Sequence, residues 1–417
     1  PSGLQQILNL AGWDTERWAT FRDGQPLSAD ETQDVLLLLM RMQSFDDESI
    51  ARWSDPAVRR ENLVAAPQDH RGQMVHFEGG RVRTIERREL PPADAERLGF
   101  PAYFECQVER NYGSPLAIVL TPRVPRAWAE LESLDEPVMV SGLFVKLAPA
   151  EGEQVPLLVA KRIVWRPERV REPYVSFGET VLAGLGVDVG LLEDVVNRQP
   201  ILPQEREVFY QILAAMGQIP PQELVRLAEG QLPVWHAQWQ AEKDRLIAAG
   251  AKQNDGRLLL AEAVLARVLE GAYSVAPLFN DSDAQFGTLV VVDGVARRAV
   301  RVEVGTTPDG QPSDVQRRFG ISDYFELEVF TDDSQNLPLV FCVRKLPAGF
   351  PTGDDIREPV RVAGFFFKTW RYQARKPADG ATAETQAQVA PLLIGSAPVR
   401  LILPESSSHL TELVAGT

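Results

Sequence analysis

The chain has little cysteine and no long apolar segment. Only Cys106 and Cys342 occur among its 417 residues, too few for a disulfide framework or a four-cysteine zinc site. No apolar run approaches the roughly 20 residues that a membrane-crossing helix needs. The formal net charge is −15, and such an excess of acid opposes the neutralisation of phosphates that nucleic-acid binding requires.

Catalytic and cofactor signatures are also missing. The chain has no GxxxxGK[ST] phosphate loop, no GxSxG nucleophile elbow and no HExxH zinc motif, and each of these chemistries needs its residues at that spacing. The four histidines are scattered without metal-ligand spacing, at His70, His76, His236 and His409. The sequence therefore predicts a non-enzyme with no cofactor and no bound metal.

What the chain does have is the composition of a folded protein. Apolar residues make up 44 % and charged residues 24 % of the sequence, as in ordinary globular domains. The length is too great for one core and predicts two to four domains.

An internal repeat organises these domains. When residues 1–53 are shifted by 174 positions they align with residues 175–227 without a gap. Identical residues occupy nine of the paired positions: Leu8/Leu182, Gly12/Gly186, Asp14/Asp188, Gln25/Gln199, Pro26/Pro200, Glu31/Glu205, Leu39/Leu213, Met42/Met216 and Arg52/Arg226. Self-similarity of this kind indicates a duplicated structural unit.

Strand-like segments repeat in the same order further along. The segment EPVMVSGLFVK at 136–146 resembles EPVRVAGFFFK at 358–368, and RLGFPAYFECQVER from Arg97 resembles RFGISDYFELEVFT from Arg318. The larger shift between these segments predicts an insertion of roughly 40 residues in the second copy, which we place near 229–270.

The helical regions have recognisable ends and faces. Ser28 and Glu31 form a capping box before the apolar run at 35–40. The insertion predicts two helices, at 234–249 and 256–271. We expect two matching sets of apolar side chains to be buried: Leu36, Leu38, Leu39 and Met42 in the first copy, and Phe209, Ile212, Leu213 and Met216 in the second.

The stretch from Gly184 to Gly190 carries four glycine and aspartate positions that superficially suggest a dinucleotide-binding loop. Only Gly186 and Asp188 have counterparts in the first copy, at Gly12 and Asp14. A turn glycine followed by an aspartate N-cap explains both copies.

Together these patterns predict an α+β multidomain chain made of two repeats, each a helical module followed by a small five-stranded β module. The expected segments are a helical module at 1–70, a β module at 71–170, a helical module at 171–285 with its inserted pair near 229–270, a β module at 286–404 and a polar tail at 405–417.

The first β module, with five expected strands and a short helical pattern from Pro125 between the third and fourth, resembles the OB-fold, a small Greek-key barrel, and the second module resembles it in its strands. In the second copy that slot is rich in proline and glycine, so we expect the helix to be absent there. An SH3-like barrel or a short sandwich would give much the same pattern. The duplication also resembles a repeat in bacterial proteins without an assigned activity, and neither resemblance implies a function.

One segment suggests a ligand. Aromatic and basic residues alternate in the strand at 365–372, where Phe366, Trp370 and Tyr372 could stack on bases while Lys368 and Arg371 hold phosphates. Lys146 is the counterpart of Lys368 in the first copy. The competing interpretation buries one set of rings inside the sheet and leaves the cations to solvate the other face.

The charge distribution favours that competing interpretation. Residues 71–165 carry a net charge of −1 and residues 286–400 are neutral, whereas each helical region carries −6. The β modules therefore lack the basic surface typical of nucleic-acid binders. We expect a non-enzymatic scaffold or interaction protein with a protein partner. Single-stranded nucleic-acid binding is the first alternative, and a role as the soluble part of a membrane-anchored assembly is the second. The sequence leaves the partner, the compartment and the oligomeric state open.

Overall fold

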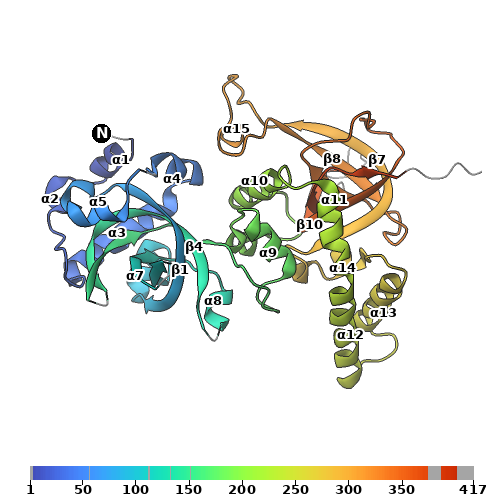
Figure 1. Ribbon diagram of the computed structural model, residues 1–417, viewed down its shortest axis with the longest axis horizontal. Coiled ribbons are helices and arrows are strands. Elements are labelled where there is room, and N and C mark those ends of the chain that lie inside the picture. Colours follow the sequence, from blue (N-terminus) through green and yellow to red (C-terminus); the bar gives the residue numbers. More distant parts are fainter. Residues whose placement is uncertain are drawn as a thin grey trace, which may run out of the picture. The chain divides into compact units, whose positions relative to one another are not determined.

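The computed structural model describes residues 3–55, 57–110, 113–131, 133–150, 152–373 and 387–401. Its chain divides into two compact units, Pro1–Glu193 and Asp194–Thr417 (Figure 1). Each unit combines helices with one six-stranded sheet, so the predicted number of five strands per module is wrong by one. The two sheet-bearing repeats agree with the predicted α+β class, while the finer domain bounds stay a prediction.

Six helices of the first unit precede its strands in the sequence, two lie between strands, and one follows the last strand. They are α1 (Gly3–Leu10), α2 (Thr15–Trp18), α3 (Ala29–Ser44), α4 (Asp47–Trp53), α5 (Arg60–Ala65), α6 (Pro67–His70), α7 (Pro92–Leu98), α8 (Ala127–Glu130) and α9 (Phe177–Gly184), with a 3₁₀ turn at η1 (Val189–Asp194). The predicted capping box is confirmed, because the Ser28 hydroxyl accepts from the Glu31 amide and the Glu31 carboxylate accepts from the Ser28 amide.

The strands of this unit are β1 (Met74–Glu89), β2 (Ala102–Arg110), β3 (Pro115–Thr121), β4 (Glu136–Ala150), β5 (Glu153–Val159) and β6 (Val164–Trp165). Their order in the sheet is β1-β2-β3-β5-β4-β6, and β1 pairs with β4 as well. The β3–β5 pair is parallel.

The second unit repeats this plan. Its helices are η2 (Pro203–Glu205), α10 (Arg206–Ala215), α11 (Pro221–Glu229), α12 (Leu232–Ala248), α13 (Gly256–Leu269), α14 (Ala276–Asn280), η3 (Ser282–Ala284) and α15 (Asp314–Phe319). Two helices, α12 and α13, lie where the sequence predicts the inserted pair. The slot that was expected to lose its helix has none among the described residues 344–357.

The second sheet contains β7 (Leu289–Glu303), β8 (Asp323–Phe330), β9 (Leu339–Val343), β10 (Glu358–Gln373), β11 (Ala387–Gly395) and β12 (Val399–Arg400). The order is β11-β9-β8-β7-β10-β12, with β11 also pairing with β10. The pair β11–β9 is parallel, as β3–β5 is in the first unit. When the strands are numbered within each unit, both sheets have the same pairings: first with second, second with third, third with fifth, fifth with fourth, and fourth with first and sixth. The third and fifth strands are parallel in both.

The predicted core positions of both copies are buried. Leu39 and Leu213, which the repeat pairs, are each 0 % exposed. The other six predicted side chains are at most 3 % exposed: Leu36, Leu38, Met42, Phe209, Ile212 and Met216. The predicted burial is confirmed at all eight positions, in agreement with the register of the repeat.

Two glycines, Gly142 and Gly364, hold equivalent places in β4 and β10. A glycine inside a strand often marks a bulge or a sharp bend, but here the register shifts come after Phe144 and Phe366. A side chain at either glycine would press on the adjoining strand, since a Cβ would lie 3.1 Å from the Cβ of Leu158 or from the Cα of Gly395. Close approach of the neighbouring strand explains both glycines.

Candidate functional site

Lys146, a predicted ligand contact, lies inside the first unit. Its side chain is 0 % exposed, and its Nζ donates to Glu31 Oε1 at 2.8 Å. Glu31 stands at the start of α3 and also accepts from the amides of Arg22 and Ser28, each at 2.8 Å. The bulge after Phe144 aims the lysine from β4 toward this carboxylate.

The second unit reproduces this arrangement. The Nζ of Lys368 donates to both oxygens of Glu205 at 2.8 Å and to the carbonyl of Pro200 at 3.0 Å, and both side chains are 0 % exposed. Glu205 accepts from the amides of Val196 and Leu202 at 2.7 and 2.8 Å. These amides are the repeat counterparts of Arg22 and Ser28.

A second contact lies next to each pair. The Oδ1 of Asp23 accepts from the Leu147 amide at 2.8 Å, and the Gly24 amide donates to the Leu147 carbonyl at 2.9 Å. In the second copy Asn197 Oδ1 accepts from the Thr369 amide at 2.6 Å. We call the lysine–glutamate pair together with this amide contact the joint, because it ties a helical module to its sheet.

The electrostatics of the joint follow from burial. Burial lowers the pKa of Lys368, although its hydrogen bonds and charge interaction with Glu205 act in the opposite direction. At Glu31 burial acts to raise the pKa, but hydrogen bonds from Lys146, Ser28 and Arg22 outweigh it and the pKa is lowered. Ionised side chains are tolerated in such a site because each glutamate accepts from a lysine and from two backbone amides.

The aromatic residues of the predicted ligand strand divide into two groups. Phe366 is 0 % exposed and packs against Phe286, with ring centroids 6.3 Å apart. Trp370 and Tyr372 are half-buried and stack on one another, with centroids 5.0 Å apart and planes inclined by 26°. Arg371 lies between them on the strand, so its side chain points to the opposite face.

The predicted ligand residues are therefore not gathered on one surface. Lys146 and Lys368 pair with buried glutamates, and Phe366 belongs to the core. Trp370 and Tyr372 retain partial exposure but have Ala148 and Ala150 as counterparts in the first copy. The assignment of these residues to ligand binding stays a prediction, whereas the joint is an interaction that sequence reasoning missed.

The glycine–aspartate turns behave as local structure. Asp14 caps α2 by accepting from the Arg17 amide at 2.9 Å, as predicted. Asp188 is buried and accepts from the Trp165 amide and from the Arg162 guanidinium, both at 3.0 Å. Burial raises the pKa of Asp188 against the influence of Arg162. The contacts of Asp188 therefore connect the start of η1 to the β6 region.

The feature that most distinguishes the second copy is its insertion. Helices α12 and α13 pack against each other, with Trp235, Trp239 and Leu246 of α12 buried, as are Leu258 and Leu265 of α13. An ion pair of 3.1 Å between Lys243 and Glu262 joins the helices on the solvent side. The insertion is a helical hairpin with its own small core.

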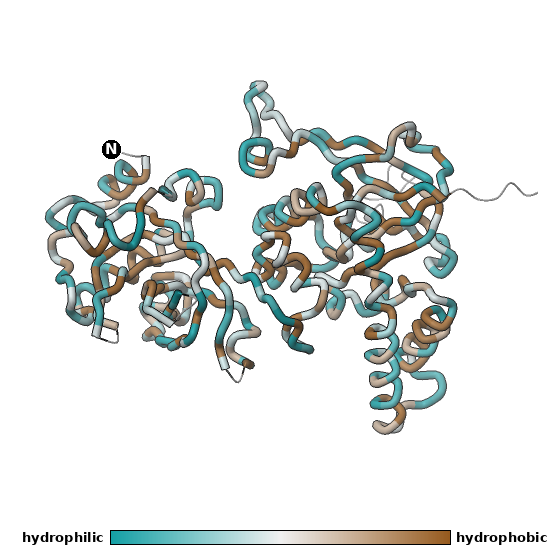
Figure 2. The backbone as a smooth tube through the Cα atoms, in the orientation of Figure 1, coloured by the Kyte–Doolittle hydropathy of each residue, from teal (hydrophilic) through white to brown (hydrophobic). Residues whose placement is uncertain are grey.

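The outer surface of this hairpin is partly apolar. Val234 and Ile247 of α12 are 48 % and 52 % exposed, and Leu259 and Leu269 of α13 are 49 % and 80 % exposed. Figure 2 shows hydrophobic positions along α13 where the hairpin extends from the sheet. Apolar side chains left in water on a folded element are typical of contact surfaces.

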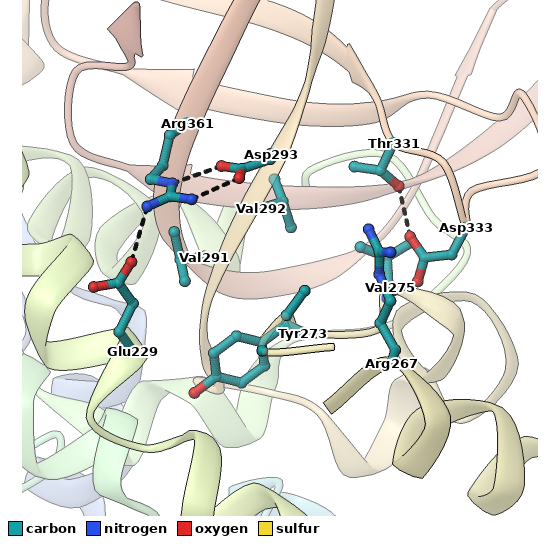
Figure 3. A pocket seen from close by; sticks show the side chains of 12 residues that line it. Glu229, Arg267, Tyr273, Val275, Val291, Val292, Asp293, Thr331, Asp333 and Arg361 are labelled. Atoms are coloured by element: carbon teal, nitrogen blue, oxygen red, sulfur yellow. Dashed lines mark hydrogen bonds and ion pairs between the residues drawn. The ribbon is translucent and has the colours of Figure 1, made fainter. Parts of the chain in front are cut away.

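A small pocket of about 70 Å³ lies at the root of the insertion (Figure 3). Arg361 lies on one side of it, bound to Asp293 through two hydrogen bonds of 2.6 Å and to Glu229 at 3.1 Å. Asp333 lies on the other side and accepts from the Val275 amide at 2.8 Å. Met139 takes the place of Arg361 in the first copy, so the ion pairs of Arg361 are not repeated there.

The polar groups that line the pocket bind mainly to one another and to nearby backbone atoms. The Tyr273 hydroxyl donates to the Ala228 carbonyl at 2.7 Å, and burial raises the tyrosine pKa. Every carboxylate and Arg361 already has a partner within the lining or its backbone. The pocket therefore anchors the insertion to the sheet through α11 and the residues after α13.

Possible metal ligands and the two cysteine thiols are further candidates, next to the pocket and the joint, for sites of chemistry. Within the described ranges no three His, Cys, Asp or Glu side chains cluster as metal ligands. Cys106 and Cys342 are buried free cysteines, and burial raises the pKa of both, which keeps them as unreactive thiols at neutral pH.

Comparisons with protein-family models and with curated proteins give no match to this chain. Within the described parts of both units, no helix has the length and apolar character needed to cross a membrane. Function must therefore be argued from the residues themselves.

Proposed function

We propose that the protein is a non-enzymatic interaction protein built from two copies of a helical module and an OB-like sheet. The strand order supports an OB-like barrel. In each unit the first, second, third, fifth and fourth strands are neighbours in that order, and the fourth pairs again with the first. A five-stranded Greek-key barrel needs this ring of pairings.

We further propose that the protein partner docks on the insertion. The observation that carries this proposal is the exposure of Leu259 and Leu269 on a helical hairpin that has no counterpart in the described part of the first unit. Duplicated modules share the joint and the sheet order, so an element added to one copy is where a function of that copy would reside. A folded helix that presents apolar side chains at helical spacing suits a groove or another helix.

The same reasoning weighs against the nucleic-acid alternative. Strand binding needs exposed rings beside unpaired cations. The cations at Lys146 and Lys368 are engaged by glutamates, and the ring of Phe366 is buried. The remaining rings, Trp370 and Tyr372, stack on each other, so each ring has one face covered by the other.

Photo-crosslinking tests the docking proposal. We expect a benzoylphenylalanine at position 259 to form a discrete covalent adduct in an extract of the cells that express the protein. Position 337 is the matched control, because Leu337 and Leu259 are both 49 % exposed but Leu337 lies between β8 and β9. Adducts of equal yield at both positions, or none at 259, would contradict the proposal.

A further inference from the structure

The segment 187–193 belongs to the second repeat by sequence but to the first unit by structure. It aligns with residues 13–19, near the start of the first repeat, yet the first compact unit extends to Glu193. Four of its apolar side chains are at most 5 % exposed: Val187, Val189, Leu191 and Leu192. The first unit therefore includes residues that begin the second copy.

The guanidinium of Arg162 holds this segment between two carboxylates. Its Nε donates to Asp188 Oδ2 at 3.0 Å, and its Nη1 donates to Asp47 Oδ1 at the start of α4. The side chain of Asp188 is 2 % exposed and that of Arg162 is 18 % exposed. Since Asp188 also accepts from the Trp165 amide, one ion-pair network connects α4, the residues around β6 and the start of η1.

Two further contacts fix the end of the segment. The carboxylate of Glu193 accepts from the amide of Arg126, directly before α8, at 2.8 Å. A Cβ at Gly190 would lie 3.4 Å from the Cγ of Pro125, so the backbone of the segment lies close against the chain before α8. The segment is thus seated on the first unit by charge, by a backbone contact and by close packing.

The charges of this network are specific to the first copy. The segment VPLLVAKRIVW, which contains Arg162, repeats as APLLIGSAPVR, with Ala397 in the place of the arginine. Pro221 takes the place of Asp47 in the second copy. Neither alanine nor proline can form an ion pair, so the network occurs at the β module that another copy follows in the chain.

We propose that Arg162 is a clasp that fastens residues 187–193 to the first unit, and that this clasp opens while the sheet of that unit stays folded. The segment is not a member of the sheet, so its release breaks no pairing between strands. Short segments outside the strand ladder open at a lower free energy than the strands themselves. The clasp lies in the first unit and is independent of the docking proposed for the insertion.

Hydrogen exchange of the full chain, followed by mass spectrometry, tests the clasp. In Arg162→Met we expect exchange in residues 187–193 to become about tenfold faster, because the loss of hydrogen bonds between charged groups favours local opening. Exchange in α4 should rise as well, while β1, β2 and β3 keep their protection. Arg162→Lys keeps the charge but lacks the planar fork that reaches both carboxylates, so its effect should be intermediate.

The matched control is Arg83→Met, because Arg83 also pairs with two carboxylates of the same unit, Glu109 and Asp135. This variant should leave exchange in residues 187–193 unchanged. Arg162→Met/Asp188→Asn should exchange more slowly there than Arg162→Met, since no buried carboxylate is left without its cation. The inference is overturned if Arg162→Met leaves residues 187–193 protected, or if it speeds exchange equally throughout the first unit.

Discussion

Replacing Lys368 by methionine is expected to lower the free energy of unfolding of the second unit by about 3–5 kcal/mol. The substitution removes the Nζ that donates to Glu205 and Pro200, so a carboxylate that is 0 % exposed loses its compensating charge. Hydrogen exchange followed by mass spectrometry should show faster exchange in β10 and in residues 196–206. Peptides of the first unit should be unchanged.

The duplicated joint supplies the matched control. Lys146→Met should speed exchange in β4 and around Glu31 while β10 keeps its protection. The double variant Lys368→Met/Glu205→Gln should be more stable than Lys368→Met alone, because it removes the uncompensated charge, and the single amide oxygen still accepts from one of the two backbone amides, Val196 or Leu202. Unchanged exchange in Lys368→Met would show that the joint does not hold the module to its sheet.

Leu213→Ala is expected to cost about 2–5 kcal/mol, the range for truncating a fully buried leucine. Leu39→Ala should cost a similar amount in the first unit, since the repeat pairs these positions and both are 0 % exposed. Leu10 is 91 % exposed, so Leu10→Ala should change stability by less than about 0.5 kcal/mol. Urea unfolding monitored by circular dichroism measures all three, and equal effects would contradict the assigned packing.

Local and periodic features of the fold could be predicted from the sequence. The capping box at Ser28 and Glu31 and the buried faces of α3 and α10 depend on residues a few positions apart, where spacing determines contact. The duplication supported these predictions, because the same apolar positions recur in both copies. It also identified the insertion, which has no counterpart in the first copy.

The joint could not be predicted in the same way. Glu31 and Lys146 were each recognised as repeated residues, but 115 positions separate them, and no periodicity connects a helix start with a bulge in β4. Lys368 was interpreted as a surface cation because lysine is rarely buried without a partner. A signal was present, since Glu31 and Lys146 recur as Glu205 and Lys368, and both lysines follow apolar stretches of sequence.

The position of the bulge could not be predicted from the sequence, for a related reason. Glycine in a strand indicates either a bulge or close backbone approach, and only the three-dimensional register distinguishes them. At Gly364 the neighbouring Gly395 backbone comes close, whereas the bulge falls after Phe366. That displacement aims Lys368 inward and thereby removes it from the surface on which a ligand strand would lie.

Titration of a fluorescent single-stranded oligonucleotide at low salt, followed by anisotropy, tests the central claim that the repeated modules use their cations and rings internally and act through protein contacts. We expect no saturable binding of DNA or RNA, because the described cations of this strand are paired or separated from the rings. The contrary result would be micromolar binding that weakens with salt at a slope of about −0.7 per phosphate neutralised and disappears in Trp370→Ala and Arg371→Ala.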